Sequence, residues 1–160
     1  MKCGEEKHRA GEAMRKLSIA CLLVGCLFVS FIVSGQNPGQ YIIVVNNSNE
    51  VTTISRKDLS KLFLKKKTRW NSGKEVLPVD LLETSRIRDR FSQDIHRRPL
   101  AKVKAYWQNQ VFSGKRFPPP QFEYERDVLS FVASDSGAIG YISTTTPVDG
   151  FDVHIVSITN

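Results

Sequence analysis

The chain has 160 residues, and its 23 Lys and Arg against 16 Asp and Glu give a formal net charge of +7. This length fits one compact domain, and the positive field favours anionic partners without separating phosphate from nucleic acid or an acidic membrane surface. All three cysteines lie within the first 26 residues, so the rest of the chain has no disulfides, no thiolate metal ligands and no cysteine nucleophile.

The first 35 residues have the pattern of an export signal. A basic segment ending in Met14-Arg15-Lys16 precedes the apolar run Leu17–Val33, and small residues stand before Gln36, as a signal peptidase requires. We therefore expect a signal peptide over 1–35, in which 1–13 is an extension of the gene model if Met14 is the true start. Residues 1–35 hold five basic and three acidic side chains, so the mature domain 36–160 keeps 18 and 13, a balance of +5. The expected location is the periplasm or the medium.

Two other interpretations of this leader stay open. Leu23-Val24-Gly25-Cys26 resembles a lipoprotein cleavage box, which would anchor the protein to a membrane through a lipid on Cys26. Against it, the apolar residues 27–33 would follow the lipid, where lipoproteins usually have a polar spacer. The run is also just long enough for an uncleaved membrane anchor. A membrane contact is expected only in these two cases.

The mature chain begins with the pattern of a covered strand. Tyr41–Asn46 is almost continuously apolar, as in α/β sheets whose two faces are both buried. The Asn46–Asn49 loop follows at its carboxyl end, where open α/β sheets bind ligands, although asparagines also form plain turns. Ser55 and Asp58 then predict a helix start, and Lys65–Lys67 suit its C-terminus. No aromatic residues alternate with these lysines, so no nucleic acid is expected.

The middle of the chain predicts a turn, a strand and a helix. Trp70 lies in the turn, and we expect its ring to clamp that loop onto the core. Glu75–Asp80 is the expected strand. The first turns of the predicted helix Arg86–His96 carry Arg86, Arg88 and Arg90. Their positive charge has the wrong sign for the positive end of a helix dipole. Either an oxyanion on the first-turn amides compensates them, or Glu83 and Asp89 do.

The last third predicts two helices and two strands. Pro99 opens a helix that Gly114 ends, and a stiff loop follows over Ser113–Pro120. A short helix ends near Gly137, and Ala138–Ile142 is a buried strand containing Gly140. A glycine inside a strand marks a close approach, to a neighbouring element or to a ligand, and packing is the favoured interpretation. Val153–Ile158 is the final strand, in which we take His154 as structural.

No catalytic constellation emerges from these residues. Beyond the leader the chain has two histidines, His96 and His154, with no metal-binding pair, no phosphate loop and no dinucleotide fingerprint. We therefore expect no enzyme activity, no cofactor and no metal.

Several short motifs, each weak alone, occur in a specific order. They are the Ile42–Asn46 strand, Leu59–Leu64, Thr68-Arg69-Trp70 with Gly73, Leu77–Asp80, Arg88–Phe91, Tyr106-Trp107, Phe112–Lys115 and Gly137–Ile142. With this set the chain resembles the small periplasmic-binding-protein-like family related to phosphate ABC transporter substrate-binding proteins. The resemblance implies an α/β fold, a single lobe of the type 2 periplasmic binding protein kind, with a mixed sheet flanked by helices.

The resemblance also implies where a ligand binds. Full-length phosphate binders carry Ser-Gly-Thr at a helix start, and the corresponding place here reads Glu83-Thr84-Ser85-Arg86, without the glycine and with an added acid. The resemblance, carried over residue by residue, implies anion contacts at the helix start, from Thr84, Ser85, Arg86 and Arg88. It also implies contacts from Ser48 in the first loop and from Gly140 beside the cleft.

The expected function is therefore non-catalytic binding of phosphate or a related oxyanion, linked to phosphate ABC transport. About 125 mature residues make roughly one lobe, so a bound anion would stay half in water. The alternative is an envelope protein-interaction or sensor module that kept the fold and lost the ligand. Its contact surface would be Trp70, Phe117 and the Pro118–Pro120 run.

Overall fold

The computed structural model describes residues 40–160. The predicted signal peptide, the alternative start at Met14 and the lipid site at Cys26 lie outside these residues. Within the described part, no helix is both long enough and apolar enough to cross a bilayer.

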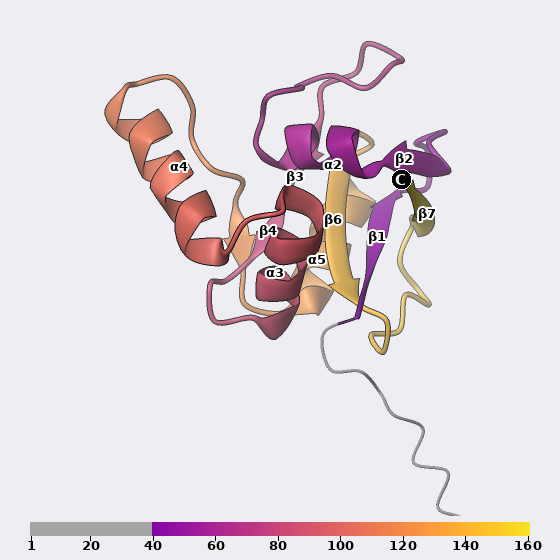
Figure 1. The fold of residues 1–160 in the computed structure, drawn as a ribbon. Coiled ribbons are helices and arrows are strands. Elements are labelled where there is room, and N and C mark those ends of the chain that lie inside the picture. Colours follow the sequence, from indigo (N-terminus) through magenta and orange to yellow (C-terminus); the bar gives the residue numbers. More distant parts are fainter. Residues whose placement is uncertain (1–39) are drawn as a thin grey trace, which may run out of the picture. The chain divides into compact units, whose positions relative to one another are not determined.

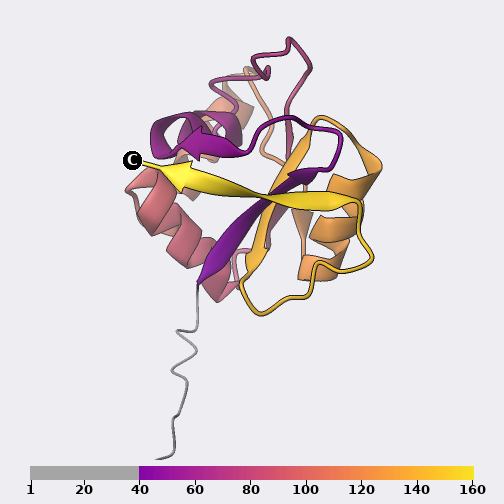
Figure 2. The same ribbon diagram turned by 90° about the vertical axis from the view of Figure 1, so that its right-hand side faces the viewer.

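A mixed five-stranded sheet forms the centre of this domain (Figures 1 and 2). Its order is β2 (Thr53–Ser55), β7 (Val153–Thr159), β1 (Tyr41–Asn46), β6 (Ala138–Ser143) and β3 (Leu77–Pro78). Strand β1 is antiparallel to both β6 and β7, while the outer strands β2 and β3 run parallel to their neighbours. Two short parallel strands, β4 (Asp80–Leu81) and β5 (Gln121–Phe122), form a second sheet.

Helices cover both faces of the sheet, as the covered-strand pattern predicts (Figure 1). The covering helices are α2 (Arg56–Phe63), α3 (Arg86–Phe91) with its π-helical continuation η2 (Ser92–His96), and α5 (Glu125–Ser134), whereas α4 (Leu100–Phe112) lies farther from the sheet. Alternation along β6 separates the two faces. Gly140 faces α5, and Tyr141 faces the aromatic residues of α2 and α3. The predicted α/β class and its mixed sheet are therefore confirmed.

An aromatic cluster joins α2 and α3 to the sheet. The rings of Phe91 and Tyr141 stack with centroids 4.0 Å apart and planes 4° from parallel. Phe63 lies 4.7 Å from Phe91, and Tyr41 meets both Phe91 and Tyr141 edge-on. Burial of each such ring stabilises the fold by about 2–3 kcal/mol. This cluster fixes the position of α3 against β6, and with it the predicted binding segment.

Most predicted elements are confirmed. Strand β1 has the predicted bounds, and the side chain of Ser55 caps α2 by accepting from the Asp58 amide at 3.1 Å. Trp70 is buried, and its indole N–H donates to the Gly137 carbonyl at 3.0 Å, as a clamp would. His154 bonds the Val51 carbonyl at 2.9 Å, which is a structural role.

The predicted strand Glu75–Asp80 is wrong in its extent. Its residues form two two-residue strands, β3 and β4, which belong to different sheets. Pro78 does not interrupt the pairing with β6, because β3 is an edge strand and an N–H at this position would point away from β6. The Leu77 amide before it donates to Gly137 at 3.0 Å, and the change of partner comes after Val79. The Val79 amide still donates to Ile139 at 2.9 Å, whereas the Asp80 amide donates to Pro120 at 2.9 Å.

Candidate functional site

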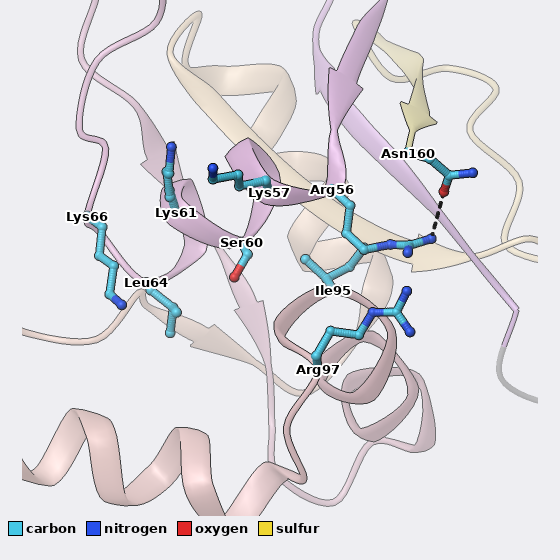
Figure 3. Close-up of a pocket in the computed structure, with 9 residues that line it drawn as sticks. All are labelled: Arg56, Lys57, Ser60, Lys61, Leu64, Lys66, Ile95, Arg97 and Asn160. Atoms are coloured by element: carbon cyan, nitrogen blue, oxygen red, sulfur yellow. Dashed lines mark hydrogen bonds between the residues drawn. The ribbon is translucent and has the colours of Figure 1, made fainter.

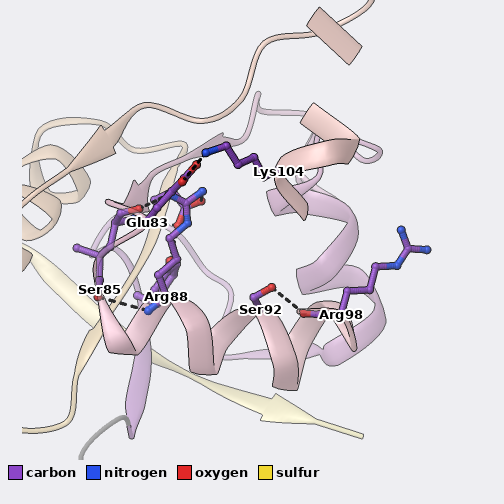
Figure 4. Close-up of polar contacts among 9 residues, drawn as sticks. Glu83, Ser85, Arg88, Ser92, Arg98 and Lys104 are labelled. Atoms are coloured by element: carbon purple, nitrogen blue, oxygen red, sulfur yellow. Dashed lines mark hydrogen bonds and ion pairs between the residues drawn. The ribbon is translucent and has the colours of Figure 1, made fainter. Parts of the chain in front are cut away.

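The predicted binding segment forms a tight loop between β4 and α3. The Ser85 amide donates to the Leu82 carbonyl at 2.9 Å, and the Ser85 hydroxyl caps the helix by accepting from the Arg88 amide at 3.4 Å (Figure 4). Thr84 and Arg86 are exposed beside it. The first amides of a helix have no intrahelical acceptor and carry its positive dipole end. The loop therefore presents donors to solvent.

Three of the predicted contacts share one hollow of about 450 Å³. Its lining residues are Glu83, Thr84, Ser85, Arg86, Asp89, Arg90, Gln93 and Leu100. The hollow thus combines hydroxyls and guanidinium groups with carboxylates, so its charge depends on how those groups are paired.

The carboxylates around the hollow already have partners. The pairs are Glu83 with Lys104 at 2.9 Å, Asp94 with Arg90 at 2.8 Å, and Asp89 with the Gln93 amide at 2.9 Å. Of the two expected sources of compensation, Glu83 forms its ion pair with Lys104, whereas Asp89 has only the neutral Gln93 amide as a partner and keeps its negative charge in the hollow. In the part of the chain that the structure describes, no carboxylate lies within ion-pair distance of Arg86.

Arg88 lies beneath this hollow and does not line it. Its side chain is only 5% exposed and pairs with Asp80 at 3.0 Å, while another guanidinium nitrogen donates to the Leu81 carbonyl at 2.6 Å. The Tyr141 hydroxyl also donates to Asp80. Burial raises the pKa of Asp80, and the Arg88 charge and the Tyr141 hydrogen bond oppose that rise. Arg88 therefore holds β4 against α3 and supports the loop from inside.

Asp80 is the residue that the sequence reasoning missed at this site. Its only sequence signal is an acid at the end of an apolar run, eight positions before an arginine in the first turn of a helix. Burial also raises the pKa of Tyr141 well above its usual value, so its hydroxyl stays protonated and keeps donating to Asp80.

Ser48 lies in a different hollow from the α3 start. That hollow, about 440 Å³, is lined by residues that include Trp70, Asn71 and Ser136. The Ser48 hydroxyl and amide both donate to the Asn46 side chain, at 2.7 and 3.0 Å. The Asn46 amide in turn donates to two carbonyls at the end of α5. These bonds hold the turn after β1 against α5.

Gly140 is buried under α5. A Cβ added there would lie 2.6 Å from Val128 Cγ1 and 3.0 Å from Val79 Cγ1. The close approach predicted from this glycine is therefore to a neighbouring helix. No open space adjoins it.

Metal ligands are not grouped anywhere in residues 40–160: no three His, Cys, Asp or Glu side chains come together as a metal site would require.

Comparison with known proteins gives a result at the level of fold. No protein-family model matches the chain, and no curated protein sequence does. A solved structure from Clostridium perfringens, designated a phosphate ABC transporter substrate-binding protein with bound phosphate, matches with a TM-score of 0.57 and 16% identity over 74% of this chain and 44% of that one. An ABC-type phosphate transport receptor from Vibrio cholerae matches with a TM-score of 0.52 and 17% identity, over 74% of this chain and 45% of the receptor. PstS from Borrelia burgdorferi matches with a TM-score of 0.52 and 14% identity, over 75% of this chain and 47% of PstS.

The chain thus spans less than half the length of these solved proteins. Its fold is similar to one part of phosphate ABC transporter substrate-binding proteins, which confirms the predicted single-lobe form. Identities this low establish the fold and leave the ligand open.

Proposed function

We propose that this protein binds phosphate or a related oxyanion, without catalysis, at the start of α3. One observation carries the proposal: in the hollow beside Thr84 and the capped helix start, Arg86 has no carboxylate partner among the described residues. A helix start with a free guanidinium and a hydroxyl offers an anion several charge-assisted hydrogen bonds. Support also comes from the fold, which is shared with a protein solved with phosphate bound.

The other predicted contacts have reduced roles in this proposal. Arg88 acts indirectly, because its buried pair with Asp80 fixes the loop that carries Thr84 and Ser85. Ser48 and Gly140 take no part, since one lies in another hollow and the other beneath α5.

The expected affinity is weak. An anion in this open hollow keeps part of its water shell, and the higher dielectric constant there weakens each charge interaction. A few charge-assisted hydrogen bonds, less the cost of association, leave about 4 kcal/mol, a dissociation constant on the order of 1 mM.

The proposal extends to where the protein works. Residues 1–35 would direct export, and the domain 36–160 would act in the periplasm or outside the cell. Its partner would be an ABC transporter for phosphate or another envelope protein. Support for this comes from the leader's sequence pattern and from the transport proteins that share the fold.

Isothermal titration tests the site directly. The protein is expressed from Met1, purified as the cell processes it, and titrated with phosphate, with sulfate in a parallel series. We expect saturable phosphate binding that Arg86→Ala weakens at least about tenfold, the loss of one charge-assisted bond. Arg116→Ala removes an exposed arginine outside the hollow and should leave the affinity unchanged. No binding up to tens of millimolar phosphate would refute the proposal.

A protein-interaction module is the second candidate, and exposed aromatic residues favour it. Phe112 is 89% exposed at the end of α4, and Phe117 is 71% exposed in the loop that follows. Trp70, which was expected in the same contact surface, is only 6% exposed and belongs to the core. On this alternative Arg86→Ala has no anion affinity to remove, whereas Phe112→Ser and Phe117→Ser abolish binding to an envelope partner.

A further inference from the structure

A basic pocket of about 730 Å³ lies away from the α3 start. Figure 3 shows it between α2, the end of η2 and the residue that follows β7. Its lining residues are Arg56, Lys57, Ser60, Lys61, Leu64, Lys66, Ile95, Arg97 and Asn160. It shares none of them with the hollow at Thr84–Arg86.

The charged side chains of this pocket have one sign. Five of its nine lining residues are Lys or Arg, and none is Asp or Glu. Lys61 alone among the five is ion-paired within the described residues, to Asp58 at 3.3 Å, and both side chains of that pair are about 40% exposed. A concave surface lined by like charges focuses the potential and raises the local concentration of counter-ions.

Arg56 carries an unmet hydrogen-bonding requirement at the pocket wall. One terminal nitrogen donates to the Asn160 side chain at 3.2 Å (Figure 3). Its Nε is buried and has no partner, and it is the one such side-chain nitrogen or oxygen in the described part of the chain. Folded proteins almost always satisfy such a donor with protein, water or a ligand.

Arg97 adds a strained backbone beside Arg56. It ends η2 in the left-handed conformation, with φ 55° and ψ 36°. Glycine usually occupies this position at a helix end, because a Cβ crowds the following carbonyl. The π-helical turn before it is an irregularity that is frequent at functional sites. The chain therefore places a guanidinium where glycine would fit the backbone better.

His96 lies next to the pocket, and nearby positive charges help to lower its pKa. Its ring bonds the Ser60 hydroxyl at 2.9 Å, and Ser60 lines the pocket. Burial lowers the pKa of His96 to about 4, with further lowering from the charges of Arg98, Arg88 and Lys66. The ring is thus neutral at physiological pH, and the pocket's charge comes from its lysines and arginines.

We propose that this pocket binds a multiply charged, phosphate-bearing anion larger than a single phosphate. The five cations line a space of about 730 Å³, so one phosphate group reaches only some of them, whereas two or three linked groups reach both arginines and the lysines opposite. The same chemistry occurs in a free oligophosphate and in the phosphate headgroups of an anionic membrane surface. Either source fits guanidinium groups that bind phosphate oxygens in pairs.

The test is titration with tripolyphosphate of the protein expressed from Met1 and purified as processed. Two variants form a matched pair, since Arg97 and Lys65 both have a left-handed backbone, with φ 55° and 50°, and only Arg97 lines the pocket. Arg97→Gly and Lys65→Gly each remove one cation and relieve the same kind of strain. Both should keep or raise the thermal midpoint, which shows that the variants fold.

We expect Arg97→Gly to weaken tripolyphosphate binding at least about tenfold and Lys65→Gly to change it less than about twofold. Lys57→Ala, at an exposed side chain, should weaken it as well. Arg86→Ala should leave the tighter tripolyphosphate site intact, which separates this pocket from the proposed phosphate site. Equal losses in the two glycine variants, or no saturable binding, would overturn the proposal.

Vesicles containing an anionic phospholipid distinguish the two sources. Vesicle binding that Arg97→Gly abolishes and tripolyphosphate competes away supports the proposal with a membrane surface as the source. Tripolyphosphate binding without vesicle binding supports it with a free oligophosphate. Tight binding of a single-stranded oligonucleotide that survives Arg97→Gly, with no tripolyphosphate site, would instead assign the charge to nucleic acid and overturn the proposal.

Discussion

His96 lies in a buried environment, unlike an exposed histidine. Its ring lies between α2 and η2, bonded to Ser60 and edge-on to Phe91 at 5.5 Å. Because burial and three nearby cations lower its pKa to about 4, it stays neutral where an unfolded histidine, near 6.5, becomes charged.

This difference makes the stability of the fold depend on pH. Between pH 6.5 and 4 the unfolded chain binds the His96 proton and the folded chain does not, so acidification favours unfolding. We expect protonation of this one site to cost about 3 kcal/mol of stability across that window and nothing more below it. Urea unfolding at several pH values should show that His96→Gln loses less stability on acidification than the unmodified protein does. Parallel curves for the two proteins would contradict the prediction.

Single-residue roles were predictable where a local pattern determines them. Ser55, three positions before an acid, predicts its cap, and Gly140 inside an apolar run predicts a close approach. The role of Arg88 was not predictable, because its burial depends on Asp80, a partner from another element. The buried residues of the helix include Arg88 together with Phe91 and Ile95, and an arginine gives no signal of its own that it lies on the apolar face.

The Asp80–Arg88 pair acts at the scale of elements, because it fixes β4 against α3. Removing one partner of a buried ion pair leaves the other charge uncompensated. Arg88→Ala should therefore lower the free energy of unfolding by about 3–5 kcal/mol. Arg90→Ala is the matched control on the same helix, since the Arg90 side chain is 61% exposed and its pair with Asp94 is reached by solvent, and the change should cost less than about 1 kcal/mol. Chemical denaturation measures both, and similar losses would show that the buried pair has no special role.

The break between β3 and β4 shows where element prediction fails. The apolar run that includes Val76, Leu77 and Val79 predicts one strand, whereas the chain leaves β6 after Val79 and pairs with β5 from Asp80 onward. Sequence periodicity predicts that a segment is extended, but the partner it pairs with depends on distant residues such as Ile139 and Pro120. The loop that carries Thr84 and Ser85 starts from this second pairing, so its position could not be derived from local patterns.

At the scale of the whole described domain, the packing is uneven. The large core surrounds β1 and β6, whereas α4 packs through a small separate cluster of Leu64, Val103 and Trp107. Figure 1 shows α4 standing apart from the sheet. Two further side-chain bonds support it, from the Tyr106 hydroxyl to the Leu64 carbonyl at 3.0 Å and from Lys104 to Glu83 at 2.9 Å. The fold resemblance gives the order of these elements and does not give the strength of this attachment.

Segments held by few buried contacts open locally before the whole fold does. We therefore expect amides of α4 to exchange with solvent at least about tenfold faster than those of β1 and β6 in native-state hydrogen exchange. Tyr106→Phe removes one hydrogen bond, worth about 1 kcal/mol, and should speed α4 exchange about fivefold without affecting β1. Tyr124→Phe, at an exposed tyrosine, should change neither. If α4 exchanged only together with the sheet, the small cluster would be as strong an attachment as the main core, and the Phe112 end of α4 could not move independently to meet a partner.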